Sequence, residues 1–436
     1  MYTSHLLCGI FVLRTKPTMD KSTNNFSGQP IFGQLLSYIP KEIFNSCVSI
    51  HNSEAAHKTV STWDQFTFMF YGVLTGSATL REIAKNFALF GSNLAHCGIA
   101  TIPARSSISD ANRNRGAAVF GTLHTKLYLH YKPYFSDSPY VFKKINGEVD
   151  PKSVEIFDSS TVSLFSDVYK NTGRIPENGQ KKGGIKAFTK INLGERVPNF
   201  VCLKAATTNE KLFLSELHLP AGTIVVFDKG FQKFSQYEQW GQSDIGFVTR
   251  LNKNAKFEIL ENFALDETTE EGVIKDAKIA LKYYCPKTKQ QETTIARLVA
   301  YIDPETGNEL AFLTNLFKIK AITVCMLYKN RWVIEPLFKQ IKQNFELTYF
   351  LSDSEEGIKT QIWIALILNL LLTVWHKITK ETEDFSTLVK VAAKNCGSYV
   401  NYLKFILNPT MFIKVVKEDI KKMQLELFVK TKGIVF

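Results

Sequence analysis

The spacing of apolar residues changes along the chain and divides it into regions of different secondary structure. Between residues 31 and 135, apolar residues such as Phe66 and Phe70 recur every three or four positions, which predicts amphipathic helices. From about residue 150 the spacing shortens to alternation, which predicts strands. Helical spacing returns after Phe317. We therefore expect an all-helical N-terminal domain at 31–135, followed by an α/β domain.

The strands of the α/β region are predicted from two kinds of pattern. Val154 and Ile156 begin an alternating stretch, whereas the residues from Ile224 to Phe227 form a continuous apolar run, as in strands buried on both faces. Further strand-like segments, separated by turn-forming residues, fill the region from about 245 to 316. We expect one α/β domain at 150–380, with a β-rich insertion at about 245–316.

The two ends of the chain differ in character. Residues 1–30 hold a short apolar stretch and then a polar segment that opens at Met19, and we expect them to be disordered or an extension with no role in the fold. The pattern at 381–436 predicts a helical C-terminal region. The most apolar run, from Ile362 to Trp375, is about 14 residues long and too short to span a bilayer. We therefore expect it to form a buried core helix, and we expect no membrane partner.

The composition fits a folded protein with a polyanionic partner. Of the 436 residues, 45% are hydrophobic and 22% are charged, which is ordinary for a chain with a sizeable core. Lysine and arginine number 53 against 41 aspartate and glutamate residues, a net charge of +12, and such an excess favours nucleic acid as a partner. The seven cysteines show no zinc-binding or disulfide-type spacing, so we expect a reducing compartment, the cytoplasm.

Two basic segments are candidates for DNA contact. In the helical region, a break precedes a polar helix that carries Arg105, Arg113 and Arg115, and this order is typical of DNA-binding helical units. The alternative is an ordinary helical bundle with a solvated basic face. In the α/β region, seven basic residues lie between Lys170 and Arg196, and Lys186 is one of them.

Two aspartates stand where a carboxylate is costly. Asp158 falls inside an apolar strand pattern, and Asp228 ends the apolar run of another strand. A carboxylate buried in a strand costs several kcal/mol unless it is paired or binds a metal. For Asp228, which Lys229 and Gly230 follow, an ordinary turn or cap residue is an equal alternative.

A third group of polar residues lies on a predicted helix. Tyr328, Arg331, Glu335 and Lys342 fall within about 60° of one another on helical geometry. The alternative is a surface salt-bridge face, but apolar residues flank the four positions and indicate a substantially buried helix. Pro336 directly follows Glu335 and disfavours helical geometry there, so the helix is expected to kink or begin nearby.

Tyr328-x2-Arg331-x3-Glu335-x6-Lys342 resembles the YREK signature of bacterial insertion-sequence transposases of the "insertion sequence four" family. The resemblance covers about residues 30 to 376. It implies a ribonuclease H-like mixed-sheet catalytic core with a β-rich insertion, preceded by the all-helical domain.

Two further motifs carry the resemblance. Residues 158–161, Asp-Ser-Ser-Thr, resemble the family's first-aspartate motif, and residues 228–231, Asp-Lys-Gly-Phe, resemble its second. The chain departs from the usual pattern at Lys229 and Phe231, where Arg and Tyr are common, and at Phe188, where relatives often carry His. These departures leave the carboxylates intact and bear on substrate handling.

The resemblance implies DDE chemistry, in which Asp158, Asp228 and Glu335 hold two Mg²⁺ or Mn²⁺ ions and Asp158 bridges them. Hard oxygen ligands and a phosphate substrate favour these metals. Arg331 and Lys342 would bind phosphates near the cut, and Tyr328 the terminal nucleotide. The expected DNA-binding residues are Tyr328, Arg331, Lys342, Arg250, Lys186, Arg105, Arg113 and Arg115.

The implied function is a DNA transposase that binds the terminal inverted repeats of an insertion sequence, cleaves the ends through a hairpin intermediate and joins them to target DNA. Its expected partners are double-stranded transposon ends and target DNA, with a homodimer in the synaptic complex, at the nucleoid of a bacterial cytoplasm. Two alternatives remain: a catalytically inactive DNA-binding derivative, which would lose a carboxylate, and a ribonuclease H-like nuclease without strand transfer.

Overall fold

The computed structural model describes residues 28–55, 59–136, 144–163, 183–252, 254–265, 271–285, 288–347 and 349–432. Two sequence predictions fall largely outside these residues. They are the extension at 1–30, of which only 28–30 are described, and the basic stretch that begins at Lys170, whose first four members are not described.

The described strands form one nine-stranded sheet in the order β3-β2-β1-β4-β5-β9-β8-β7-β6. In its first half, β1, β2 and β3 pair antiparallel, while β4 and β5 run parallel to β1. This order and these directions confirm the predicted ribonuclease H-like mixed sheet. The five core strands are β1 (Val154–Ser163), β2 (Gly184–Asn192), β3 (Pro198–Ala205), β4 (Ile224–Phe227) and β5 (Gly246–Arg250).

The β-rich insertion continues the core sheet. Its strands are β6 (Phe257–Asn262), β7 (Val273–Cys285), β8 (Gln290–Ile302) and β9 (Glu309–Thr314). Strand β9 pairs antiparallel with β5, with Val248 opposite Thr314. The insertion predicted at 245–316 included β5, but β5 pairs in parallel with β4 and is a core strand. The apolar composition of β5 predicts a buried strand and does not show which strand it pairs with.

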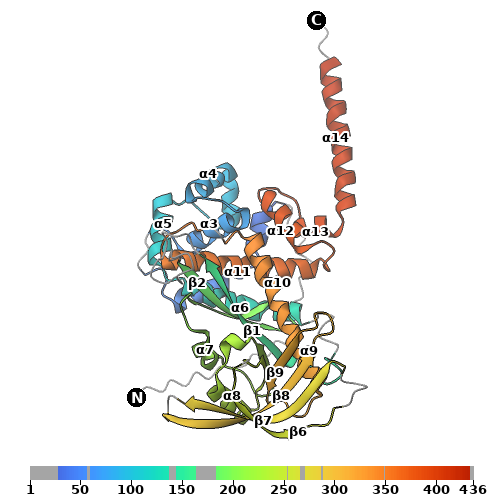
Figure 1. Ribbon diagram of the computed structural model, residues 1–436. Helices are drawn as coiled ribbons and strands as arrows, with labels where there is room; N and C mark the ends of the chain where they lie inside the picture. Colours follow the sequence, from blue (N-terminus) through green and yellow to red (C-terminus); the bar gives the residue numbers. More distant parts are fainter. Residues whose placement is uncertain are drawn as a thin grey trace, which may run out of the picture.

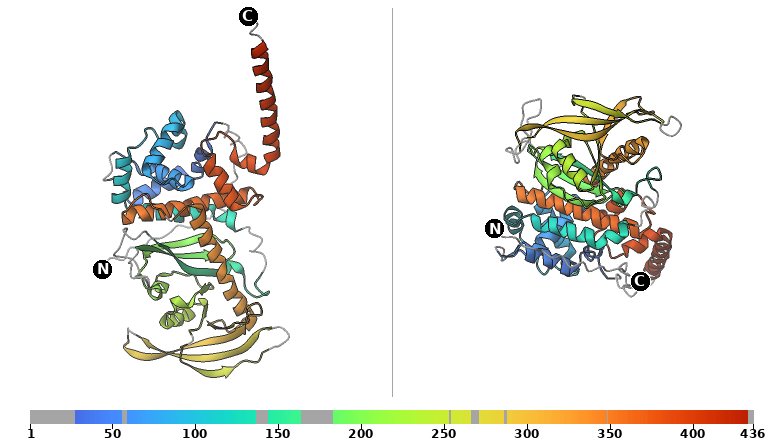
Figure 2. Two further views of the ribbon diagram at one scale, coloured as in Figure 1. Left: turned by 45° about the horizontal axis from the view of Figure 1, so that its top comes forward. Right: turned by 90° about the horizontal axis from the view of Figure 1, so that it is seen from below.

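The helical N-terminal region is confirmed, and it packs against the rest of the chain. Its helices are α1 (Ile31–Leu36), α2 (Lys41–Ile50), α3 (Thr62–Thr75), α4 (Leu80–Phe90), α5 (Arg105–Asn114) and α6 (Ala118–Phe135). Ser61 begins α3 with a capping box that includes Asp64. In Figures 1 and 2 these helices lie on one side of the sheet, in a helical layer.

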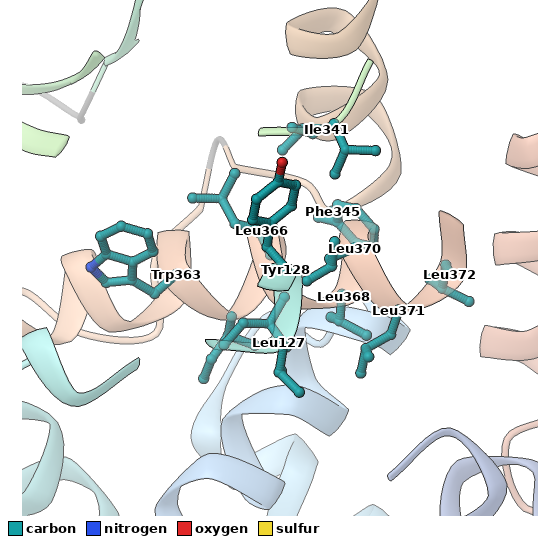
Figure 3. Close-up of a cluster of buried hydrophobic side chains, with 14 of the residues drawn as sticks. Leu127, Tyr128, Ile341, Phe345, Trp363, Leu366, Leu368, Leu370, Leu371 and Leu372 are labelled. Atoms are coloured by element: carbon teal, nitrogen blue, oxygen red, sulfur yellow. The ribbon is translucent and has the colours of Figure 1, made fainter. Parts of the chain in front are cut away.

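Helix α11 (Glu355–Ile378) lies in the middle of this layer and packs against α3, α5, α6 and α12. Leu127 and Tyr128 of α6 contribute to the same apolar cluster as Leu366 and Leu370 of α11 (Figure 3). Among the described residues, α11 is the one helix long and apolar enough to cross a membrane, and nearly all of its apolar window is buried. The predicted apolar run is thus part of a longer helix that forms the centre of the core.

The C-terminal region closes the helical layer. It consists of α12 (Phe385–Lys394), α13 (Tyr402–Leu407) and α14 (Pro409–Lys432). The backbone N–H groups of Ile31 and Phe32 donate to the carbonyls of Ser398 and Cys396, so α1 is tied to the segment after α12. Helix α14 extends away from the body in Figure 1.

Four helices connect the strands or follow them. They are α7 (Glu210–Phe213), α8 (Phe234–Gln242), α9 (Ala321–Lys329) and α10 (Ile334–Asn344). Helix α10 runs from the sheet to the helical layer (Figure 1), and its Ile341 and Phe345, just past its end, reach the core around α11 (Figure 3).

The buried His124 of α6 should make stability depend on pH. Burial lowers the pKa of His124 from 6.5 to about 4, and its ring lies 5.8 Å from that of Trp363. Because the unfolded chain takes up a proton near pH 6.5 and the folded chain only near pH 4, the folded state loses about 3 kcal/mol as the pH falls between these values. A His124→Leu variant should show a flatter decline in the free energy of unfolding over this range. His218→Gln, at an exposed histidine, should keep the wild-type slope; an unchanged slope in His124→Leu would refute this account.

Candidate active site

The two aspartates meet because their strands are neighbours. Strand β1 pairs in parallel with β4, and Phe157 lies opposite Phe227. The next residue on each chain is Asp158 on β1 and Asp228 just past the end of β4, so both lie at the same edge of the core sheet. Both are partly exposed, while the phenylalanines before them are buried.

The four residues of the YREK signature lie on three successive elements. Tyr328 is near the end of α9, Arg331 is in a 3-10 segment (Asn330–Val333), and Glu335 and Lys342 are on α10. The predicted single helix face is therefore broken between Tyr328 and Glu335. Pro336 falls in the first turn of α10, where a missing backbone N–H has no cost, and this agrees with the expectation that a helix begins nearby.

Arg331 and Tyr328 connect the three carboxylates. The guanidinium of Arg331 donates to Asp158 Oδ2 and to Glu335 Oε1, each at 2.9 Å. The Tyr328 hydroxyl donates to Asp228 Oδ1 at 3.2 Å. Arg331 is buried, and its guanidinium carbon lies 5.1 Å from the ring centre of exposed Trp332. Residues that are more than 170 positions apart in the chain are thus brought into one cluster.

Burial makes the ionised form of Asp158 costly. Burial raises the pKa of Asp158 from 3.8 to about 6, against the lowering effects of the Ser159 backbone N–H and of Arg331. The negative charges of Asp228 and Glu335 raise the same pKa further. An ionised Asp158 therefore needs positive charge beside it, and Arg331 supplies it here.

A cavity of about 470 Å³ opens beside this cluster. It is lined by Asp158, Ser159, Glu335, Phe338, Lys339, Lys342 and Gln343. Lys342 is exposed and donates to the Thr161 carbonyl on β1 at 3.1 Å. Two carboxylates and two ammonium groups thus face one open space, a combination that suits a metal ion and a phosphate together.

The donor set fits a hard divalent cation, because three carboxylates supply oxygen ligands. Among the described residues, however, no group of three His, Cys, Asp or Glu side chains stands close enough to hold a metal ion. Arg331 pairs with one oxygen of Asp158, Oδ2, and one of Glu335, Oε1. A cation bound there would compete with this guanidinium for the same two carboxylates.

The structure places the predicted DNA contact Arg250 near this cluster and buries another, Lys186. Arg250, at the end of β5, lines a second cavity of about 530 Å³ together with Tyr328, Arg331 and Trp332. Lys186 was predicted to contact DNA, but it is buried on β2 and its ammonium bonds to Glu210 Oε1 at 2.8 Å. The many basic residues around Lys186 predict an exposed side chain. On β2, however, the Lys186 side chain points into the protein and is buried.

The three arginines around α5 also differ in exposure. Arg105 and Arg113 are exposed, and Arg113 pairs with Asp353 at 3.3 Å. Arg115 is buried and donates to the carbonyls of Ser53 and Val60 and to Gln65 Oε1, so the prediction that it contacts DNA is wrong. Arg115 is the C-cap of α5, and its extended backbone turns it out of the exposed helix face.

Glu210 was missed by the sequence analysis. Its carboxylate accepts from Ser159 Oγ at 2.9 Å and from Lys186, so it lies beside the first aspartate motif. The sequence around it shows only Asn209, the N-cap of the short helix α7. Nothing in that pattern distinguishes Glu210 from an ordinary acidic residue in a first helical turn.

The family follows from comparison with known proteins. Residues 149–371 match the family model described as transposase DDE domain, and residues 27–100 match a domain of unknown function, DUF4372. The first match spans just over half of the chain and contains all three carboxylates. The chain belongs to the transposases with a DDE domain.

Its relatives narrow the family to insertion-sequence transposases and confirm the resemblance. A sequence assigned as transposase y4zB of Sinorhizobium fredii is 23% identical over 289 residues, which cover 64% of this chain and 74% of the relative. A sequence assigned as the transposase of insertion sequence element IS4SA of Synechocystis is 26% identical over 273 residues, 59% of this chain and 72% of the relative. That of element IS5377 of Geobacillus stearothermophilus is 24% identical over 236 residues, 54% of this chain and 60% of the relative.

Among solved structures, a piggyBac transposase synaptic complex with hairpin DNA is similar over 88% of this chain and 82% of that chain. The TM-score is 0.41 and the sequence identity is 13%.

Proposed function

We propose that this transposase binds the terminal inverted repeats of an insertion sequence, cleaves the DNA ends and joins them to target DNA by two-metal-ion phosphoryl transfer. The observation that carries the proposal is the cluster of Asp158, Asp228 and Glu335 around Arg331 and Tyr328, next to a cavity lined by lysines. The family and its relatives supply the class of reaction.

Asp158, Asp228 and Glu335 would hold two Mg²⁺ or Mn²⁺ ions. When bound, these ions would activate a water or a DNA 3′-hydroxyl and stabilise the leaving oxygen. Arg331, released from one or both carboxylates, would present its planar fork to a phosphate. Lys342 and Lys339, both exposed at the cavity, would bind neighbouring phosphates.

The proposed division of labour follows from the surfaces. The core must act on any target, so its basic residues should contact the DNA backbone. End recognition needs base contacts, and the exposed Arg105 and Arg113 of α5 are the candidates for it. A homodimer would bring two ends together, and the protein would work at the nucleoid without a membrane partner.

A joining assay separates this proposal from its alternatives. Linear DNA that carries the element's terminal repeats is incubated with the protein, Mg²⁺ and a supercoiled target plasmid. We expect cleaved ends and end-to-target products in which the 3′ end is covalently joined. Cleavage without joined product would favour a nuclease without strand transfer, and binding without cleavage would favour an inactive derivative.

A further inference from the structure

A polar cluster beside the three carboxylates has no role in the chemistry described above. Glu210 Oε1 accepts hydrogen bonds from Ser159 Oγ at 2.9 Å and from Lys186 Nζ at 2.8 Å. Ser159 follows Asp158 on β1, and its backbone N–H donates to Asp158 Oδ1 at 2.7 Å. Glu210 is therefore bonded to the residue that holds one oxygen of the first aspartate.

Glu210 also lies against the turn that holds the second aspartate. Asp228 Oδ2 accepts from the backbone N–H of Gly230 at 3.3 Å. A Cβ atom added at Gly230 would lie 2.8 Å from Glu210 Oε2 and 3.7 Å from Asp228 Oδ2, so the carboxylates flank the same backbone position. A side chain at position 230 would push the Glu210 carboxylate aside. Helix α7, which begins at Glu210, packs against the turn.

Lys186 holds Glu210 in this place. Its side chain is 1% exposed and that of Glu210 is 27% exposed, and Lys186 Nζ also donates to the Thr208 carbonyl at 3.4 Å. A buried ammonium without a counter-charge costs several kcal/mol, so separation of the pair is strongly disfavoured. The Lys186–Glu210 pair thus holds the Glu210 carboxylate in a fixed position beside Ser159.

Buried aromatic rings pack on the elements that carry the cluster. Phe157, Phe188, Phe213 and Phe231 are all buried, and each lies one to three residues along the chain from a member of the cluster or from an aspartate. The rings of Phe188 and Phe213 are 4.2 Å apart, and those of Phe157 and Phe231 are 4.9 Å apart. They bind β1, β2, α7 and the turn after Asp228 into one rigid unit. Phe188 and Phe231 are two of the departures from the usual family pattern, and both serve this unit.

We propose that Glu210, held by Lys186, is a positioning residue for the metal site. Through Ser159 and the Gly230 turn it fixes the two aspartates relative to each other, without touching the reacting atoms itself. This inference rests on the proposed function, in which Asp158 and Asp228 bind divalent metal.

The test is a Glu210→Gln variant of the full chain, studied by Mn²⁺ binding and by the Mg²⁺ dependence of cleavage. Loss of a residue that orients metal ligands without binding the metal itself typically weakens metal affinity about 10–100-fold. We expect the Mn²⁺ Kd and the half-saturating Mg²⁺ concentration to rise by about this factor. We expect the cleavage rate at saturating Mg²⁺ to return towards that of the wild type. A purely structural defect would lower the rate at every metal concentration.

Glu155→Gln is the matched control. Glu155 on β1 pairs with Lys190 on β2 at 3.2 Å, away from the carboxylate cluster. Loss of the Glu155 charge should leave the metal affinity unchanged. Wild-type metal affinity in Glu210→Gln, or an equal loss in Glu155→Gln, would overturn the inference.

Ser159→Ala removes only the hydroxyl between Glu210 and β1. We expect a smaller loss of metal affinity in the same direction, and a Ser159→Ala, Glu210→Gln double variant no weaker than Glu210→Gln alone, because the residues act in one chain of contacts. If Glu210→Gln fails to fold, an unchanged metal affinity in Ser159→Ala overturns the inference. Failure of the proposed function appears separately, as a wild-type protein that binds no Mn²⁺ or an Asp158→Asn variant that binds it equally well.

Discussion

Asp158→Asn should lower the rate of DNA cleavage by about 1,000-fold or more, because the loss of one anionic metal ligand removes several kcal/mol of transition-state stabilisation. The amide keeps the size of the side chain and can still accept a hydrogen bond from Arg331, which now donates to Asp158 Oδ2. The basic side chains at the surface are unchanged, so the affinity for transposon ends should stay near that of the wild type. Cleavage of end DNA and its binding are measured on the same preparation.

The control for this prediction is Glu155→Gln. It makes the same kind of change three residues earlier on β1, where the carboxylate pairs with Lys190 rather than with the cluster. It should cleave DNA normally. An Asp158→Asn variant that cleaves at the wild-type rate in Mg²⁺ would remove Asp158 from the proposed metal site.

Arg115→Ala should lower the free energy of unfolding by about 3 kcal/mol or more. The change leaves three buried acceptors without their donor: the carbonyls of Ser53 and Val60, and Gln65 Oε1. Each unsatisfied buried group costs about 1–3 kcal/mol. Denaturant unfolding of purified variants gives the measurement.

Arg113→Ala is the matched control, two residues away. Its side chain is 59% exposed and pairs only with the exposed Asp353 among the described residues, so the loss should stay within about 0.5 kcal/mol. Equal stability of the two variants would contradict the structural role of Arg115. Of the three arginines, only Arg105 and Arg113 are exposed and stay candidates for the proposed end recognition.

Local patterns in the sequence predict the elements and the types of residue at the site. The apolar run before Asp228 predicts strand β4, and the polar residues of the YREK signature predict a cluster. The spacing alone places the signature on one helix face. Pro336 predicts that a helix kinks or begins nearby, but only the structure shows that the signature spans α9, a 3-10 segment and α10.

Partners that lie far apart in the chain are not predicted. Glu210 meets Ser159 across 51 residues, and neither residue has a local pattern that marks the contact. Arg113 and Arg115 share one basic segment, yet only the tertiary acceptors around Arg115 decide that it is buried. For the same reason, the pairing of β9 with β5 could not be read from composition alone.

The shared core around α11 limits how this transposase can evolve. A DNA-reading domain on a flexible linker can be exchanged between relatives as a cassette. Here α3, α5 and α6 bury their apolar faces on α11, a helix that lies more than 200 residues later in the chain, and α1 is hydrogen-bonded to the segment after α12. A transplanted N-terminal region would have to match that interface side chain by side chain. With the proposed role of α5 in end recognition, new specificity would arise by point substitutions on its exposed face, while the interior of the helical layer would stay under constant selection.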